Sequence, residues 1–172
     1  MLQLSETNSE LARSVRLHAR QEDFISIPDS VFEGLYGGAA YGGKSFLLTL
    51  FPLMRGFYRY RGFKGIILRR KFPDLEREII RLSHEYYPHT GAKYNEQKHS
   101  WSWPQYGSYM DFGHCLHASD IRQYDGYQVN LCGFDELTHF EQSMYEYMIG
   151  SRVRPSSDFT LAIVRSATNP GG

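Results

Sequence analysis

The sequence predicts an α/β fold in which helices flank a mostly parallel sheet. Short apolar runs alternate along the chain with longer segments of helical periodicity, and a glycine-rich segment joins the first apolar run to the first long helix. Around residues 98–113 an alternating pattern on both sides of a turn predicts a β-hairpin insertion. With 172 residues, the chain has the size of one domain.

The composition is that of a folded globular protein, with 41% hydrophobic and 22% charged residues. Because 19 basic residues balance 19 acidic ones, the net charge does not indicate a nucleic-acid partner. Residues 35–73 nevertheless contain no acid and many Lys and Arg, which suits either a phosphate backbone or a solvated surface. Two cysteines predict a reducing compartment, and no segment is apolar enough for a membrane span or a signal peptide.

In the N-terminal half, residues 1–30 are expected to form a polar arm with one helix at about 9–20, capped by Asn8 or Ser9. The expected elements that follow are a strand at 32–36, a helix at 45–58 with a kink at Pro52, a strand at 65–69 and a helix at 74–86. The last of these helices carries one apolar face, formed by Leu75, Ile79, Leu82 and Tyr86.

In the C-terminal half, the hairpin is followed by strands expected at 128–134 and 159–165. Between these two strands, Thr138 and Glu141 match a capping box, in which the Thr side chain and the Glu side chain each accept from a free backbone amide. A helix is therefore expected to begin at Thr138.

Residues 38–45 match the phosphate-binding pattern G-x-x-x-x-G-K-S/T without a mismatch. Such glycines let backbone amides surround a phosphate, and the next helix directs its positive end at the anion. Lys44 is expected to reach the β- and γ-phosphates, and Ser45 to bind Mg²⁺. The flanking strand and helix favour this interpretation over a chance match. The expected nucleotide-binding residues are Gly38, Ala39, Ala40, Tyr41, Gly42, Gly43, Lys44 and Ser45.

Asp135 and Glu136 follow the strand expected at 128–134. Asp135 is predicted to hold Mg²⁺, and Glu136 to act as the general base that activates water. Taken alone, an acidic pair before a helix can also simply complement the helix dipole. At the end of the next strand, Thr168 and Asn169 could face the γ-phosphate, although Thr-Asn-Pro is also an ordinary turn.

From about residue 24 to its end, the chain resembles the ATPase domain of the large terminase subunit of tailed bacteriophages. The segments that carry the resemblance are residues 37–45, 68–71, 107–112, 134–136 and 166–172. The resemblance implies a phosphate-loop NTPase of the additional-strand (ASCE) class, with the acid-bearing strand beside the loop strand. It also implies that Thr168 and Asn169 couple hydrolysis to DNA movement.

The function implied is Mg²⁺-dependent ATP hydrolysis that powers translocation of double-stranded viral DNA into a procapsid. The implied partners are the DNA, the portal protein, the small terminase subunit and further copies in a ring, in the host cytoplasm during virion assembly and without a membrane. Residues 1–172 are then an ATPase domain without the C-terminal nuclease domain, so no DNA cleavage is expected. The alternatives are another nucleic-acid ATPase of helicase-like type and, less favoured, a nucleotide or small-molecule kinase.

The loop lacks the arginine that many members of that family carry, so another arginine is expected to stabilise the γ-phosphate. Arg152 is the first candidate for a finger acting between subunits, with Arg154 as an alternative. Arg69 and Arg70 are candidates within the same subunit, and each of these arginines could also be a surface residue. Gln21 could bind the adenine edge, or it could be a solvated residue at a helix end.

Overall fold

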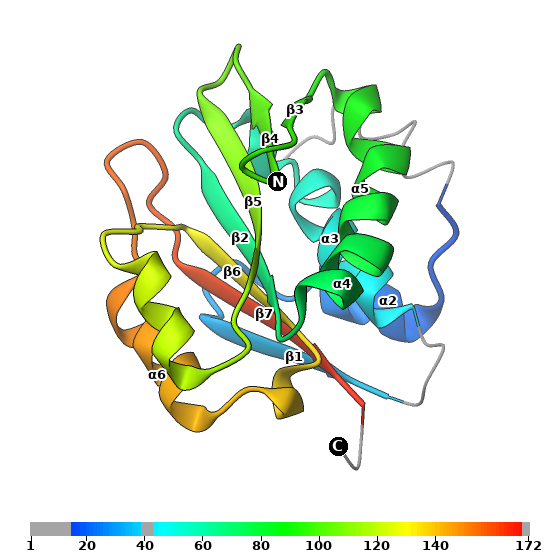
Figure 1. Cartoon of the computed structure of the whole chain (residues 1–172). Coiled ribbons are helices and arrows are strands. Elements are labelled where there is room, and N and C mark those ends of the chain that lie inside the picture. Colours follow the sequence, from blue (N-terminus) through cyan, green and yellow to red (C-terminus); the bar gives the residue numbers. More distant parts are fainter. Residues whose placement is uncertain (1–14, 39–42, 170–172) are drawn as a thin grey trace.

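The fold is built around one seven-stranded sheet of order β1-β7-β6-β2-β5-β4-β3. The computed structural model describes residues 15–38 and 43–169. The strands are β1 (Glu33–Gly37), β2 (Lys64–Arg69), β3 (Lys93–Asn95), β4 (Ser100–Trp103), β5 (Ser108–His114), β6 (Leu131–Asp135) and β7 (Ile163–Thr168). Strands β1, β7, β6, β2 and β5 pair in parallel, whereas β3 and β4 add antiparallel pairs at one end (Figure 1). The α/β prediction is confirmed.

Both faces of the sheet are covered, which explains why its central strands are apolar on both sides. In β2, Ile67 belongs to the core on one face, while Ile66 and Leu68 belong to the core on the other. Helices α3, α4 and α5 lie on the first face and α6 lies on the second (Figure 1). The α-helices are α2 (Ala19–Ile25), α3 (Lys44–Met54), α4 (Phe72–Asp74), α5 (Arg81–Tyr86) and α6 (Gln142–Ser151).

Short 3₁₀ and π segments complete the helical layers. The 3₁₀ segments are η1 (Phe57–Arg59), η3 (Tyr87–Thr90), η4 (Ala118–Tyr124) and η5 (Leu137–His139), and the π-helical segment is η2 (Leu75–Ile80). Within the described part of the chain, none of the helices is long and apolar enough to cross a membrane.

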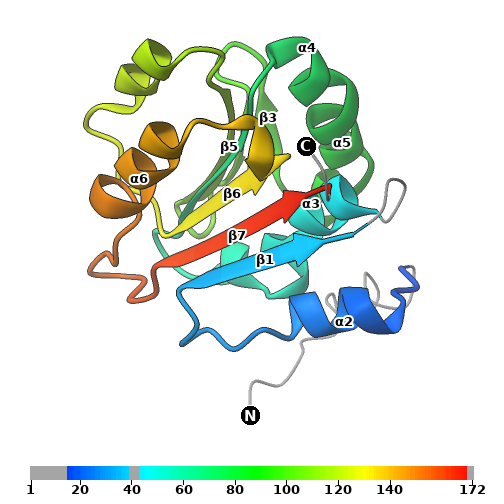
Figure 2. The same cartoon turned by 90° about the horizontal axis from the view of Figure 1, so that it is seen from below.

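Strand β7 lies between the loop strand β1 and the acid-bearing strand β6 (Figure 2). The expectation that β6 would lie directly beside β1 is therefore wrong. Strand β7 is also longer at its end than expected, because the ladder continues through Thr168, which pairs with Gly37. This register brings the end of β7 against the start of the phosphate loop.

Two expected helices differ from those observed. The helix expected at 9–20 is not present over residues 15–18; residues 19 and 20 belong to helix α2, and residues 9–14 and the expected caps Asn8 and Ser9 lie outside the described residues. Helix α2 begins at Ala19, where Gln21 Oε1 accepts the backbone amide of His18 at 3.0 Å. The helix expected to reach Tyr58 ends at Met54, because Gly56 adopts a left-handed conformation (φ 69°) soon after Pro52.

The helix expected at 74–86 is present in outline, but its buried face is not the predicted one. Its π-helical turn η2 contains Leu75 to Ile80, and the wider turn changes which side chains point inward. Ile79 and Ile80 are both buried, followed by Ser83 and Tyr87, whereas Leu82 and Tyr86 are only half-buried. Uniform α-helical spacing could not predict this shift.

The capping box predicted at Thr138 does not form. Thr138 lies inside η5, and α6 begins only at Gln142, with Glu141 as its N-cap and no side-chain cap. The hydroxyl of Thr138 instead lies 2.8 Å from the hydroxyl of Thr168. A contact between two elements thus replaces the local cap.

Candidate active site

The phosphate loop enters helix α3 through Gly43, which has a left-handed conformation (φ 65°). The left-handed backbone favours glycine here, and a Cβ atom at this position would lie 2.8 Å from Gln21 Nε2, so that side chain would have to shift. Lys44 is the first residue of α3, and its ammonium donates to the carbonyl of Gly38 at 3.1 Å. Ala39 to Gly42, which were expected to bind nucleotide, lie outside the described residues.

Helix α3 is held firmly enough to orient the site. Its residues from Leu47 to Leu53 are buried in the core, and the hydroxyl of Thr49 donates to the carbonyl of Ser45 at 2.7 Å. The unpaired amides and the positive end of the helix dipole are therefore fixed at the end that carries Lys44 and Ser45. Such an end attracts an anion such as a phosphate.

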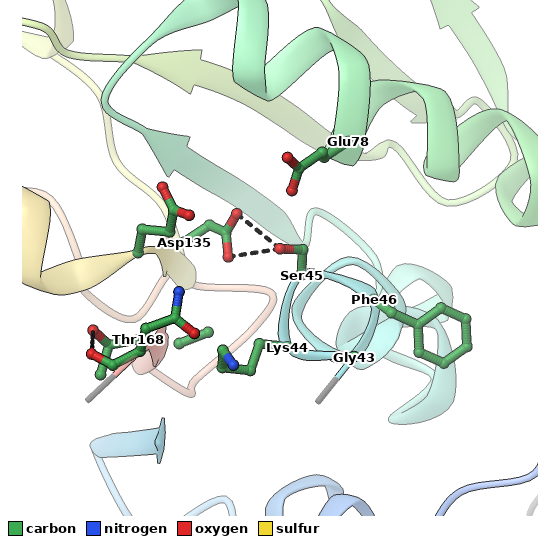
Figure 3. Close-up of a pocket in the computed structure, with 10 residues that line it drawn as sticks. Gly43, Lys44, Ser45, Phe46, Glu78, Asp135 and Thr168 are labelled. Carbon is green, nitrogen blue, oxygen red and sulfur yellow. Dashed lines mark hydrogen bonds between the residues drawn. The ribbon is translucent and has the colours of Figure 1, made fainter. Parts of the chain in front are cut away.

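Ser45 and Asp135 meet at the carboxyl ends of the parallel strands, although 90 residues separate them in the chain. The Ser45 hydroxyl lies 3.0 Å from both carboxylate oxygens of Asp135 (Figure 3). One hydroxyl and one carboxylate beside an anion-binding helix end form the kind of oxygen donor set that Mg²⁺ takes together with phosphates. The described residues therefore fit a Mg²⁺–nucleotide site.

A cavity of about 460 Å³ opens beside this pair. Its walls come from the loop exit, the start of α3, the ends of β6 and β7, and η2. The lining residues are Gly43, Lys44, Ser45, Phe46, Glu78, Asp135, Glu136, Ala167, Thr168 and Asn169. The structure thus brings together Lys44, Ser45, the acidic pair and the Thr168–Asn169 segment, as the sequence predicts.

Asp135 is only 1% exposed. Burial raises the pKa of its carboxyl to about 6, although Arg69 and the Ser45 hydroxyl act in the opposite direction. Desolvation therefore outweighs the stabilisation of the carboxylate by Arg69 and the Ser45 hydroxyl.

Glu136 has a left-handed backbone (φ 57°, ψ 54°), which is unusual for a residue with a side chain. Its carboxylate lies 3.1 Å from Arg69 Nη2 on one side and 3.1 Å from His139 Nδ1 on the other. Backbone strain of this kind costs about 1–3 kcal/mol and occurs often at functional sites. The conformation turns the chain sharply between β6 and η5 while Glu136 still lines the cavity.

Arg69 lies at the centre of the acidic side of the cavity and is 4% exposed. Its Nη1 donates to Asp135 at 2.8 Å and to Glu78 at 2.7 Å. Burial alone would lower the pKa of the guanidinium, but the surrounding carboxylates raise it above its ordinary value. The sequence pointed to Arg69 only as an alternative finger and gave no signal for Glu78, which occupies an ordinary position in a helical pattern.

Thr168, the last residue of β7, lies on the wall opposite Glu78 (Figure 3), and Asn169, which follows it, also lines the cavity. The Thr168 hydroxyl pairs with Thr138, as described above, and the buried Oδ1 atom of Asn169 has no hydrogen-bond partner among the described residues. An amide oxygen of this kind is available to a ligand in the cavity.

Gln21 is buried (4% exposed) and lies against Gly43, not in solvent as the alternative interpretation had it. Its Oε1 is already used in the start of α2. The structure therefore places Gln21 beside the loop exit, and its adenine contact stays a prediction.

The remaining candidate arginines lie outside the cavity lining. Arg152 Nη2 donates to the Tyr147 hydroxyl at 2.8 Å, and its guanidinium stacks 4.9 Å from the Tyr147 ring centre. Arg70 contacts Met144 and Glu141, and Arg154 is exposed. A role for Arg152 or Arg154 toward a neighbouring subunit stays a prediction.

The large terminase of the thermophilic bacteriophage D6E matches with a TM-score of 0.73 and 14% identity, over 91% of this chain and 40% of that one. The fold is that of the phage large terminase ATPase domains. An ATPase-domain mutant of the Thermus phage P74-26 large terminase matches with a TM-score of 0.60 and 15% identity, over 99% of this chain and 72% of that one.

The HK97 bacteriophage large terminase matches with a TM-score of 0.59 and 10% identity, over 90% of this chain and 33% of that one. The D6E protein has also been solved in complex with ADP and with ATP-gamma-S. This chain spans about 40% of the length of the D6E protein. No protein-family model matches the sequence, and no curated protein matches it.

Proposed function

We propose that this chain is a Mg²⁺-dependent ATPase that acts as the motor domain of a large terminase, driving double-stranded DNA into a procapsid. The observation that carries the ATPase assignment is the Ser45–Asp135 pair, joined at 3.0 Å in the cavity that Lys44 and Glu136 also line. The fold shared with phage large terminases supports the DNA-packaging role.

Phosphate binding belongs to the start of α3 and to Lys44. In the nucleotide-free arrangement the Lys44 ammonium donates to the carbonyl of Gly38. A triphosphate offers it stronger, charged acceptors, so Lys44 would exchange this contact for the β- and γ-phosphates. The free amides at the start of α3 would hold the same anion.

Ser45 and Asp135 would hold Mg²⁺, Ser45 through its hydroxyl and Asp135 through its carboxylate. Held by these two side chains, Mg²⁺ would supply positive charge that offsets the charge developing on the phosphates during hydrolysis. Asp135 is suited to this role because its carboxylate is fixed by its neighbours and cannot rotate freely in the buried site.

Glu136 would accept a proton from the water that attacks the γ-phosphorus, so that ATP and water give ADP and phosphate. Its carboxylate lines the cavity and is less buried than that of Asp135, with 29% of the side chain exposed. A neighbouring carboxylate dedicated to water favours hydrolysis over transfer to a metabolite, and this favours an ATPase over a kinase.

Thr168 and Asn169 would report the γ-phosphate to the rest of the motor. Thr168 contacts Thr138 in η5, the segment that directly follows Glu136. A change at the γ-phosphate could therefore move the end of β7 and η5 together. Portal protein, small terminase subunit and ring neighbours are further partners in this proposal, with Arg152 as the first candidate for an arginine supplied between subunits.

The proposal is tested by calorimetric titration of the chain with ADP and with ATP-gamma-S, with and without Mg²⁺. We expect Lys44→Ala to weaken binding of both nucleotides about 10- to 100-fold, the equivalent of one lost charged contact. Ser45→Ala should weaken binding only when Mg²⁺ is present. Lys93→Ala, which removes an exposed lysine on β3, is the matched control. Equal nucleotide affinities for Lys44→Ala and the unchanged chain would refute the assignment of this cavity as the nucleotide site.

The DNA-motor part is tested by adding duplex DNA to an ATP turnover assay. We expect duplex DNA to increase phosphate release more than single-stranded DNA of equal length. A supercoiled plasmid incubated with the chain and Mg²⁺ should remain intact, because no nuclease activity is expected here. Nicking of the plasmid would show that the nuclease expectation is wrong.

A further inference from the structure

One buried guanidinium contacts every carboxylate that lines the cavity described above. Arg69 Nη1 lies 2.8 Å from Asp135 and 2.7 Å from Glu78, and Nη2 lies 3.1 Å from Glu136. These carboxylates come from three elements: the end of β6, the turn into η5, and the π-helical segment η2. Arg69 itself ends β2 and pairs with His114 of β5, so strand pairing fixes its backbone on that side.

Arg69 holds two adjacent carboxylates with its two terminal nitrogens. A guanidinium is planar and rigid, so an Nη1 hydrogen bond to Asp135 and an Nη2 ion pair with Glu136 set the relative orientation of the two carboxylates. These are the adjacent residues to which the proposed function gives different tasks. Because Arg69 is almost fully buried, its charge must be paired to be tolerated there.

Glu78 supplies the contact on the other side of the guanidinium. Its side chain points from η2 into the cavity (Figure 3), and its 2.7 Å contact is the shortest of the three that Arg69 makes. Its second oxygen lies 3.7 Å from Arg77, a longer contact at the surface. Glu78 belongs to no part of the phosphate-loop, acidic-pair or Thr168 elements, and it comes from the one π-helical segment in the described part of the chain.

We propose that Glu78 and Arg69 are a positioning pair: Glu78 fixes the guanidinium of Arg69, and Arg69 holds Asp135 and Glu136 in the orientations that the site uses. This inference rests on the proposed function, because it concerns how the general base is held. The inference also gives Arg69 a different role from the expected arginine finger, because its Nη atoms already contact carboxylates. In this role Arg69 affects hydrolysis by orienting Glu136, and it does not contact the γ-phosphate as an arginine finger would.

The first test needs no reaction. Nuclear magnetic resonance of the nucleotide-free chain with ¹⁵N-labelled arginine reports rotation of each guanidinium, and the Arg69 signal is identified by its loss in Arg69→Lys. We expect slow rotation for Arg69 in the unchanged chain and at least tenfold faster rotation in Glu78→Gln. Glu76→Gln removes an exposed acid from the same helical turn and should leave the signal unchanged. Fast rotation of the Arg69 guanidinium in the unchanged chain would overturn the proposal that Glu78 fixes it.

The second test measures turnover of the same variants. Glu78→Gln should lower kcat about 10- to 100-fold, the size of effect seen when a supporting residue of a site is removed. The KM for ATP and the ADP affinity should stay within about twofold, because Glu78 does not hold the phosphates in this proposal. Glu78→Asp should recover part of kcat, and Glu76→Gln should have no effect. A raised KM with unchanged kcat would overturn the positioning role.

A double-variant cycle separates this proposal from a general loss of structure. If Glu78 acts through Arg69, adding Glu78→Gln to Arg69→Lys should cause no further loss of turnover. Independent, additive losses would contradict the pair. If the unchanged chain does not hydrolyse ATP at all, the proposed function fails, and the resonance experiment alone decides whether Glu78 fixes Arg69.

Discussion

Two aspartates in this chain have carboxyl groups whose pKa is raised by burial, but different neighbours stabilise their charged forms. Burial raises the pKa of both Asp135 and Asp111 to about 6. Asp135 keeps Arg69 as a buried partner at 2.8 Å, whereas Asp111 relies on the hydroxyls of Ser100 and Tyr127 and on a more distant lysine. Asp135 lines the cavity beside Ser45, but Asp111 does not line that cavity, and its charge serves no step of the proposed function.

Asp111→Asn should therefore stabilise the protein at neutral pH. Because the folded-state pKa of about 6 lies above the unfolded value of 3.8, the ionised carboxylate costs stability above pH 6, and the cost disappears as the pH falls below 4. A shift of this size corresponds to about 2–3 kcal/mol, or a Tm increase of about 4–10 °C at pH 7.5.

Thermal unfolding between pH 4 and pH 8 measures this effect, with the exposed Asp158→Asn as the control. The stability advantage of Asp111→Asn should shrink steadily as the pH is lowered from 6.5. A variant that is less stable than the unchanged chain at pH 7.5 would show that the carboxylate is stabilising.

At the scale of elements, the site depends on where β6, β7 and α3 end. The register of β7 places Thr168 opposite Gly37 and Ala167 opposite Asp135, so this wall of the cavity is formed by strand pairing. Segment η5 then joins Glu136 to Thr138, whose hydroxyl contacts Thr168. The proposed general base and the proposed coupling segment are thus connected through one side-chain contact.

Thr138→Val keeps the shape of the side chain but removes this hydrogen bond. We expect basal ATP turnover to stay within about twofold, because Thr138 does not line the cavity. Stimulation of turnover by duplex DNA should be lost, since the movement of η5 and β7 would no longer be linked. Thr160→Val changes an exposed threonine and should behave as the unchanged chain does. Full DNA stimulation in Thr138→Val would remove this contact from the coupling route.

Most of these elements could be predicted from the sequence, because each depends on a pattern of neighbouring residues. The apolar run of β2 and the alternation in the hairpin reflect which side chains are buried, and the glycines before Lys44 reflect the backbone of a tight loop. The π-helical turn in η2 left no such signal, since Leu75 and Ile79 also suit a regular helix. The Thr138–Glu141 pattern predicted a local cap, but a partner 30 residues away competes for the Thr138 hydroxyl.

At the scale of the whole molecule, the parallel sheet gathers residues from distant parts of the chain at one edge. Lys44, Ser45, Asp135 and Glu136 could be predicted to meet there, because the carboxyl ends of parallel strands share an edge. The order of the strands could not be predicted in full, and β7 proved to lie between β1 and β6. Glu78 also escaped prediction, because its contact with Arg69 depends on how η2 packs over the end of β2.

The central claim is that this edge hydrolyses ATP with Glu136 as the base. The most direct measurement is phosphate release from ATP and Mg²⁺ by the purified chain, over a wide range of protein concentration, beside Glu136→Gln. We predict turnover that rises faster than linearly with protein concentration, as expected if a neighbouring subunit supplies Arg152, and that disappears in Glu136→Gln although ATP still binds. Undiminished turnover in Glu136→Gln, or none in the unchanged chain at any concentration, would contradict the account.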